Sequence, residues 1–188
     1  MTFNIYLKTQ VIFGYEKITL LLVITLILWS CSNDNNNCHG IDCLPPATQT
    51  GEGTFGCLVN GEPYVDNSGS FNCYYQFVDG EYYFNISPKK DIINIDQIRI
   101  SSNMMEFVLN TSIELNENSP NEFYAEIGLL DTPGDFTTTN EIDGTIIITK
   151  FDAESNIVSA LFEFNILIPS TGETIHITEG RFDSLFTE

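Results

Sequence analysis

The sequence predicts an all-β domain, an antiparallel β-sandwich or a small barrel of about 9–11 strands, which follows a signal peptide and a flexible stalk. Three observations favour this fold. Short runs of β-branched and aromatic residues follow one another from residue 54 onward. Turn signals such as Asn-Gly and Asp-Gly separate these runs. No window after residue 30 repeats its apolar positions with the 3.6-residue period of a helix.

Residues 1–30 are predicted to be an export signal. Ile18 to Trp29 form a run of 12 residues without a charge, preceded by Lys8 and Lys17. A membrane-spanning helix needs about 20 apolar residues, whereas a signal peptide needs roughly 7–15 behind a positive segment. A core helix or an uncleaved anchor is the alternative interpretation of the same run.

The signal ends in a sequence that resembles a bacterial lipobox, Leu28-Trp29-Ser30-Cys31. In that class of protein the signal is cleaved before the cysteine, which becomes the lipidated N-terminus. Two or three acyl chains hold a protein on a membrane stably, whereas one holds it only marginally. We therefore expect acyl chains on Cys31 to make the membrane a partner, in an outer-membrane lipoprotein of the cell envelope facing the periplasm or the cell surface.

The charge balance excludes two classes of partner. The chain has 26 acidic and 7 basic residues and a formal net charge of −19. Loss of the signal removes Lys8, Lys17 and Glu16, which leaves 25 acids, 5 bases and a net charge of −20. Nucleic acid and anionic lipid headgroups both require clustered Lys and Arg, so neither is an expected partner of the folded domain.

A stalk is predicted over residues 31–53, and a single all-β domain over 54–188. The segment after Cys31 is rich in Asn, Gly and Pro and shows no periodicity, which is typical of irregular chain. Pro45-Pro46 favours an extended, semi-rigid conformation there.

The first hairpin joins Phe55–Val59 to Glu62–Val65 through Asn60-Gly61, because a tight hairpin turn needs residues that tolerate a positive φ. Pro63 cannot donate a ladder hydrogen bond, so its strand is expected at a sheet edge.

A second hairpin joins Phe71–Val78 to Glu81–Ser87 through Asp79-Gly80. In this register Tyr75 pairs with Phe84. Alternation along each strand then defines two faces. The predicted core face carries Phe71, Cys73, Tyr75, Phe77, Tyr82, Phe84 and Ile86, and the predicted wet face carries Asn72, Tyr74, Gln76, Glu81, Tyr83 and Asn85.

Seven further runs have strand character. In the longest, Ile157–Ile168, the even positions from Val158 onward are apolar and their neighbours are mostly polar, as a half-buried antiparallel strand requires. The others are Ile95–Ser101, Met104–Leu109, Ser112–Leu115, Phe123–Leu130, Thr145–Phe151 and Thr174–Phe182.

Four cysteines remain once Cys31 is lipidated, and an even number in an exported protein suggests two disulfides. Cys57 and Cys73 both fall on predicted core faces, which favours a bond between them and leaves Cys38–Cys43 as a clip in the stalk. Two alternatives stay open, namely free buried thiols at Cys57 and Cys73 and a zinc site that includes His39.

A family resemblance covers both ends of the domain. Residues 44–61 read LPPATQTGEGTFGCLVNG, and residues 172–183 read GETIHITEGRFD. Both are similar to segments of an uncharacterised lipoprotein family of Bacteroidota, which opens with an LPPxTQTGxxTFGC stretch and an NG turn. The resemblance implies a β-rich envelope lipoprotein and brings no catalytic residue with it.

The chain offers no recognisable catalytic motif, so we expect a non-catalytic structural or interaction module rather than an enzyme, with no cofactor. Calcium is a weak candidate ligand at Asp66–Ser70 and at Asp131–Asp135, where Asx turns are the ordinary explanation. The partner is then an unidentified envelope protein or a glycan.

Two alternative functions stay open. Tyr74 and Tyr83 are diagonal neighbours on the predicted wet face, where they offer rings that stack on a sugar or another ligand. A hydrolase that uses two of the many carboxylates is the less favoured alternative.

Overall fold

The computed structural model describes residues 38–92 and 95–188, which form one compact unit from Cys38 to Glu188. The predicted signal peptide and the predicted lipidation site Cys31 lie outside the described residues. A short 3₁₀ helix, η1 (Gly40–Cys43), precedes the strands.

The first sheet has six strands in the order β2-β1-β12-β11-β10-β7. All its pairs are antiparallel, and β11 and β12 form its centre. The strands are β1 (Thr54–Val59), β2 (Glu62–Asp66), β7 (Ser112–Glu114), β10 (Gly144–Asp152), β11 (Ile157–Ile168) and β12 (Glu173–Leu185).

The second sheet runs β3-β4-β6-β8-β9, and β5 pairs with β6. Both β4 and β5 pair with β6, and Pro88, which cannot donate to a ladder, lies between them. The strands are β3 (Asn72–Val78), β4 (Glu81–Ser87), β5 (Lys89–Ile92), β6 (Ile95–Asn103), β8 (Glu122–Leu129) and β9 (Asp135–Thr137).

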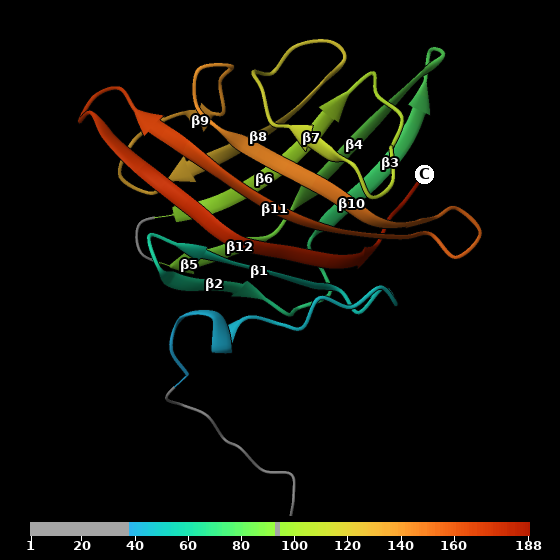
Figure 1. The fold of residues 1–188 in the computed structure, drawn as a ribbon, viewed down its shortest axis with the longest axis horizontal. Coiled ribbons are helices and arrows are strands. Elements are labelled where there is room, and N and C mark those ends of the chain that lie inside the picture. Colours follow the sequence, from blue (N-terminus) through green and yellow to red (C-terminus); the bar gives the residue numbers. More distant parts are fainter. Residues whose placement is uncertain (1–37, 93–94) are drawn as a thin grey trace, which may run out of the picture. The chain divides into compact units, whose positions relative to one another are not determined.

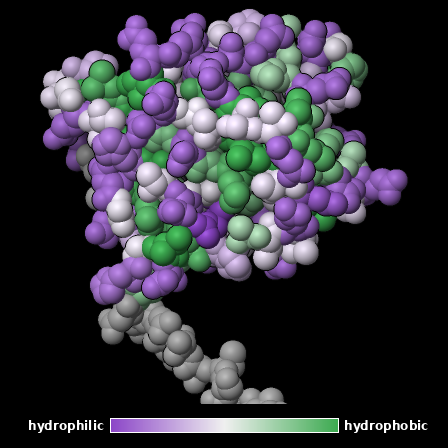
Figure 2. Space-filling model, in the orientation of Figure 1, coloured by the Kyte–Doolittle hydropathy of each residue, from purple (hydrophilic) through white to green (hydrophobic). Residues whose placement is uncertain are grey.

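The two sheets face each other as a β-sandwich and do not close into a barrel (Figure 1). Aromatic rings from both sheets meet in the core. The ring centroids of Phe84 on β4 and Phe182 on β12, in opposite sheets, are 6.1 Å apart. Those of Phe55 on β1 and Phe162 on β11, both in the first sheet, are 5.2 Å apart. The outward face of the first sheet, which Figure 2 turns to the viewer, mixes hydrophobic and hydrophilic side chains.

Local patterning predicts the long strands and hairpins well. The apolar even positions of β11, from Val158 to Ile168, are all buried. The register of the second hairpin is confirmed, with Tyr75 opposite Phe84 and Val78 opposite Glu81. Pro63 lies on β2, which is an edge strand as predicted. Within the described residues there are twelve strands, close to the expected nine to eleven.

The strand predicted over Met104–Leu109 is wrong. Met104 has a φ of 57° where β6 has ended, so the chain leaves the second sheet there. It crosses to the first sheet, where Leu109 forms a parallel bridge with Ile148 of β10. Met105 and Phe107 of this run pack against the core, whereas Val108 and Leu109 are exposed, so the run is not a strand of either sheet.

Residues 44–53, expected to belong to a flexible stalk, pack on the sandwich instead. Leu44 and Pro45 are buried. A Cβ placed on Gly56 of β1 would lie 2.5 Å from Cδ of Pro45, so only glycine lets this segment approach so closely. The compact unit that the structure describes begins at Cys38 and includes residues 44–53.

Candidate functional site

The described cysteines follow one of the two predicted pairings. Cys38 and Cys43 form a disulfide with Cα atoms 5.2 Å apart, as predicted. The predicted bond between Cys57 and Cys73 is wrong, because both are free, buried thiols. Cys57 lies on β1 and Cys73 on β3, in different sheets. Facing sheets stand about 10 Å apart, whereas bonded cysteines need Cα atoms roughly 4.4–6.8 Å apart.

These two thiols are in an environment that makes them unreactive. Burial raises the pKa of Cys57 far above its ordinary value. Burial also raises the pKa of Cys73 to about 12, although a hydrogen bond with Ser184 acts in the opposite direction. Because the thiolate is the reactive form, neither side chain is placed to act as a nucleophile.

Tyr74 and Tyr83 lie where the register predicted them, on neighbouring strands and on the outer face of the second sheet. Tyr74 pairs with Asn85, and Tyr83 pairs with Gln76. Both tyrosines are half-buried rather than fully exposed.

The row that starts at Tyr74 continues across the sheet through Asn85 and Ser101 to Tyr124 of β8. Ser101 Oγ lies 3.2 Å from Asn85 Oδ1 within this row. Asn85, Ser101 and Tyr124 are buried, so the prediction of a wet face is wrong for Asn85, and the part of this face that reaches solvent is centred on Tyr74 and Tyr83. We call this part the tyrosine face.

Neither described histidine lies in a site with catalytic geometry. His39 precedes η1, and the exposed His176 places Nδ1 2.7 Å from Oδ1 of Asn165. Of the calcium candidates, Asp66 Oδ1 accepts a hydrogen bond from the Ser68 N–H at 2.8 Å, as an Asx turn does. The described part of the chain holds no group of three or more His, Cys, Asp or Glu placed to bind a metal ion.

Among the residues that the structure describes, the carboxylate of Asp183 on β12, which is 1% exposed, accepts an unusually large number of hydrogen bonds. It accepts hydrogen bonds from Thr48 Oγ1 at 2.6 Å, the Gly51 N–H at 2.8 Å and Ser159 Oγ at 2.8 Å. The N–H groups of Thr50 and Glu52 also donate to it. Residues 44–61 and residues 172–183, the two segments on which the predicted family resemblance rests, thus meet at this carboxylate.

Burial by itself would raise the pKa of Asp183, but the hydrogen bonds from Thr48, Thr50, Gly51 and Ser159 together lower it below its ordinary value. The carboxylate is therefore ionised and saturated with donors. It holds residues 48–52 against β12, which makes it a structural clamp rather than a reactive group. We call it the Asp183 clamp.

A cavity of about 640 Å³ opens at one end of the sandwich, a size typical of small-molecule sites. It is bordered by β3 and β4, by the crossing segment after β6, by the turn after β10 and by the residues after β12. Six aromatic rings line it, those of Tyr75, Phe77, Tyr82, Phe107, Phe151 and Phe186. We call it the ring-lined cavity.

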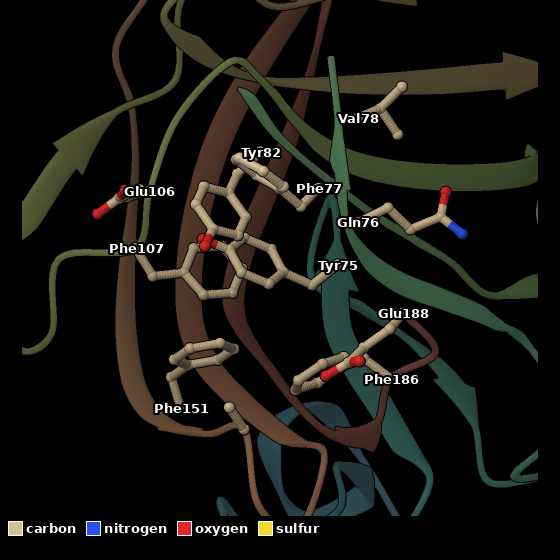
Figure 3. A pocket seen from close by; sticks show the side chains of 11 residues that line it. Tyr75, Gln76, Phe77, Val78, Tyr82, Glu106, Phe107, Phe151, Phe186 and Glu188 are labelled. Carbon is tan, nitrogen blue, oxygen red and sulfur yellow. The ribbon is translucent and has the colours of Figure 1, made fainter. Parts of the chain in front are cut away.

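Three of these rings form a stack, and Phe77 and Phe151 pack against it at larger angles. Tyr75 stacks on Tyr82 with centroids 4.9 Å apart and on Phe107 at 4.3 Å. Phe77 continues the series, 4.7 Å from Tyr82, and is 62% exposed. In Figure 3, Phe77 and Tyr82 lie on one side of Tyr75, and Phe151 and Phe186 lie on the other.

Two carboxylates, Glu106 and Glu188, line the same cavity and lie on opposite sides of the ring stack (Figure 3). Both are exposed. Burial raises the pKa of Tyr75 to about 12, with smaller contributions from Tyr82 and Glu106 in the same direction and an opposing hydrogen bond with the Phe107 backbone. The Tyr75 hydroxyl is therefore neutral at physiological pH.

Sequence reasoning placed Tyr75, Phe77 and Tyr82 on the core face but did not find the cavity. The assignment of the face is correct, yet β3 and β4 extend beyond the closed core, so the last core-facing rings border an open space. The one local signal was the pair Phe77 and Tyr82, two large rings on the core face directly beside a hairpin turn.

No helix among the residues that the structure describes is long and apolar enough to cross a membrane. No protein-family model matches the chain, and no similar protein was found among curated proteins or among solved structures. The resemblance to a lipoprotein family therefore stays a prediction.

Proposed function

We propose that this protein is a lipid-anchored module of the cell envelope that binds a ligand in the ring-lined cavity without chemically changing it. The lipobox-like Leu28–Cys31 supports the anchor, and with it the outer membrane as location. The cavity supports binding, because its rings provide a large preformed apolar contact surface beside a few polar groups.

Binding is favoured over turnover because of the environment of the two cavity carboxylates. A glycosidase-type general acid is commonly a carboxyl buried in an apolar pocket. Glu106 and Glu188 are instead both exposed at the cavity. This environment suits attraction of a ligand rather than proton transfer to it.

A fragment screen by ligand-observed NMR tests the binding proposal. The mature protein is compared with Ala153→Trp, because Ala153 is an exposed residue that lines the cavity, and an indole there occupies its mouth. Ser155→Trp is the matched control, since Ser155 is exposed in the same turn but does not line the cavity. We expect hits that are lost with Ala153→Trp and kept with Ser155→Trp. If no fragment of any charge distinguishes the two variants, the proposal is wrong.

The anchor is tested separately, by membrane fractionation and incorporation of labelled fatty acid. Cys31→Ala is expected to lose the label and the membrane association. A Cys31→Ala protein that stays in the membrane fraction with normal signal processing would contradict the lipoprotein assignment.

Glycan binding at the tyrosine face is the second proposal, and the half-buried rings of Tyr74 and Tyr83, with the Gln76 amide opposite Tyr83, support it. Stacking rings beside amide and hydroxyl groups suit a sugar. A glycan array is expected to respond to the wild type and not to Tyr74→Ala/Tyr83→Ala. An equal response would remove this proposal.

A further inference from the structure

Resting on the proposed function of the ring-lined cavity, we infer that its ligand is an organic cation, of the class that carries a trimethylammonium or similarly alkylated ammonium group. The inference joins two features that meet in one place. The cavity presents aromatic faces, and its charged groups are all acidic.

The aromatic faces are suited to a positive charge. The face of an aromatic ring is electronegative, and alkylated ammonium ions bind in cages of such rings. Tyr75, Tyr82 and Phe107 already stack on one another, so the ring that offers an open face is Phe77, at the exposed end of the stack. Phe151 and Phe186, whose centroids lie 5.4 Å apart, provide a second aromatic wall.

The charges around the cavity have one sign. Glu106 and Glu188 line it, and no Lys or Arg does. Next to Val78 at the rim lie Asp79, in the turn between β3 and β4, and Glu81, the first residue of β4. An anion is disfavoured there, whereas a cation is attracted by the carboxylates and also by the rings.

The turn between β10 and β11 repeats this arrangement. It contributes Ala153 to the cavity and carries Asp152 and Glu154 on either side of it. Lys150 Nζ lies 3.1 Å from Oδ2 of Asp152, so these two charges offset each other and Glu154 supplies the remaining negative charge of the turn. A neutral ligand would gain contact with the rings but nothing from this charge, so a cation of the same shape binds more tightly.

A pair of probes of equal shape isolates the contribution of the charge. Choline and 3,3-dimethylbutan-1-ol differ only in a quaternary nitrogen against a quaternary carbon. Both are titrated into the purified mature protein, kept in a non-ionic detergent, and aromatic proton shifts are followed. Cation–π attraction predicts that choline binds about 3- to 30-fold more tightly.

Three variants show where the preference arises. Phe77→Leu keeps an apolar side chain but removes a ring, and Glu106→Gln removes one charge from the cavity. Both are expected to reduce the preference for choline while changing the affinity of the alcohol less. Glu163→Gln, on the exposed face of β11, is the control for general attraction by the acidic surface and is expected to leave the preference unchanged.

Each other outcome overturns the inference. Equal affinity for the two probes would show that the positive charge does not contribute to binding. Choline binding that Ala153→Trp does not weaken would show that choline binds outside the cavity. If neither probe binds while the fragment screen finds neutral or anionic cavity ligands, the cation inference is wrong and the proposed function stands. Only a fragment screen that finds no ligand in the cavity would overturn both the cation inference and the proposed binding function.

Discussion

Replacing Asp183 by alanine is expected to be the most damaging single change outside the apolar core. The Ser159 hydroxyl, which donates to this carboxylate, belongs to a residue only 1% exposed. A buried donor without its acceptor costs about 1–3 kcal/mol. The N–H groups of Thr50, Gly51 and Glu52 lie nearer the surface, so water replaces part of what they lose, at a further cost of about 1–2 kcal/mol.

The expected loss is therefore about 3 kcal/mol of unfolding free energy. For a domain of this size it lowers the melting temperature by roughly 6–12 °C. Thermal and urea unfolding followed by circular dichroism measure it, with Asp143→Ala, an exposed aspartate in the loop before β10, as the control. Hydrogen exchange provides a local measurement, because the amides of residues 50–52 are expected to lose protection.

Two results would refute this reasoning. Asp183→Ala could unfold within about 1 kcal/mol of the wild type, which would mean that the hydrogen bonds of the clamp are replaced at no cost. Alternatively, the amides of residues 50–52 could stay protected in Asp183→Ala. Residues 44–53 would then be held by the burial of Leu44 and Pro45 alone.

Three further predictions concern neighbouring features. The pKa of Asp183 is lower in the folded protein than in the unfolded chain. The ionised carboxylate therefore stabilises the folded state above the unfolded pKa, and this stabilisation is lost as the pH falls through the folded pKa. The difference in melting temperature between the wild type and Asp183→Asn should therefore shrink in strong acid. Gly180→Ala places a Cβ 2.3 Å from the Phe162 ring and 2.5 Å from the Phe162 carbonyl oxygen. Urea unfolding should therefore show a loss of about 1–3 kcal/mol in the free energy of unfolding. An unchanged urea midpoint would contradict this. Cys57 and Cys73 should resist a thiol reagent in the folded protein and react once urea unfolds it; rapid labelling without urea would show that they are accessible.

Local patterning predicted the parts of the fold whose determinants are close in sequence. Alternation in β11 fixes which side chains enter the core, and the Asp79-Gly80 turn fixes the register of β3 against β4. Met104–Leu109 has the composition of a strand but crosses between the sheets, a path that its tertiary contacts decide.

The Asp183 clamp and the ring-lined cavity lay beyond such patterning for different reasons. The donors to Asp183 include backbone N–H groups more than 130 residues away, which no side-chain pattern reveals. The cavity joins rings from segments that only the sandwich brings together. Phe77 and Phe151, for instance, come from strands in different sheets.

The residues on which the predicted family resemblance rests and the residues that line the cavity are different sets. Gly56, Thr48 and Thr50 of the opening motif and Asp183 of the closing motif dock the N-terminal segment on β1 and β12. None of them lines the cavity. A protein with the same two motifs is therefore expected to keep the Asp183 clamp, while its ligand depends on the β3–β4 hairpin and the turn after β10. Exchanging Phe77 and Glu106 should change what such a protein binds and leave its clamp intact.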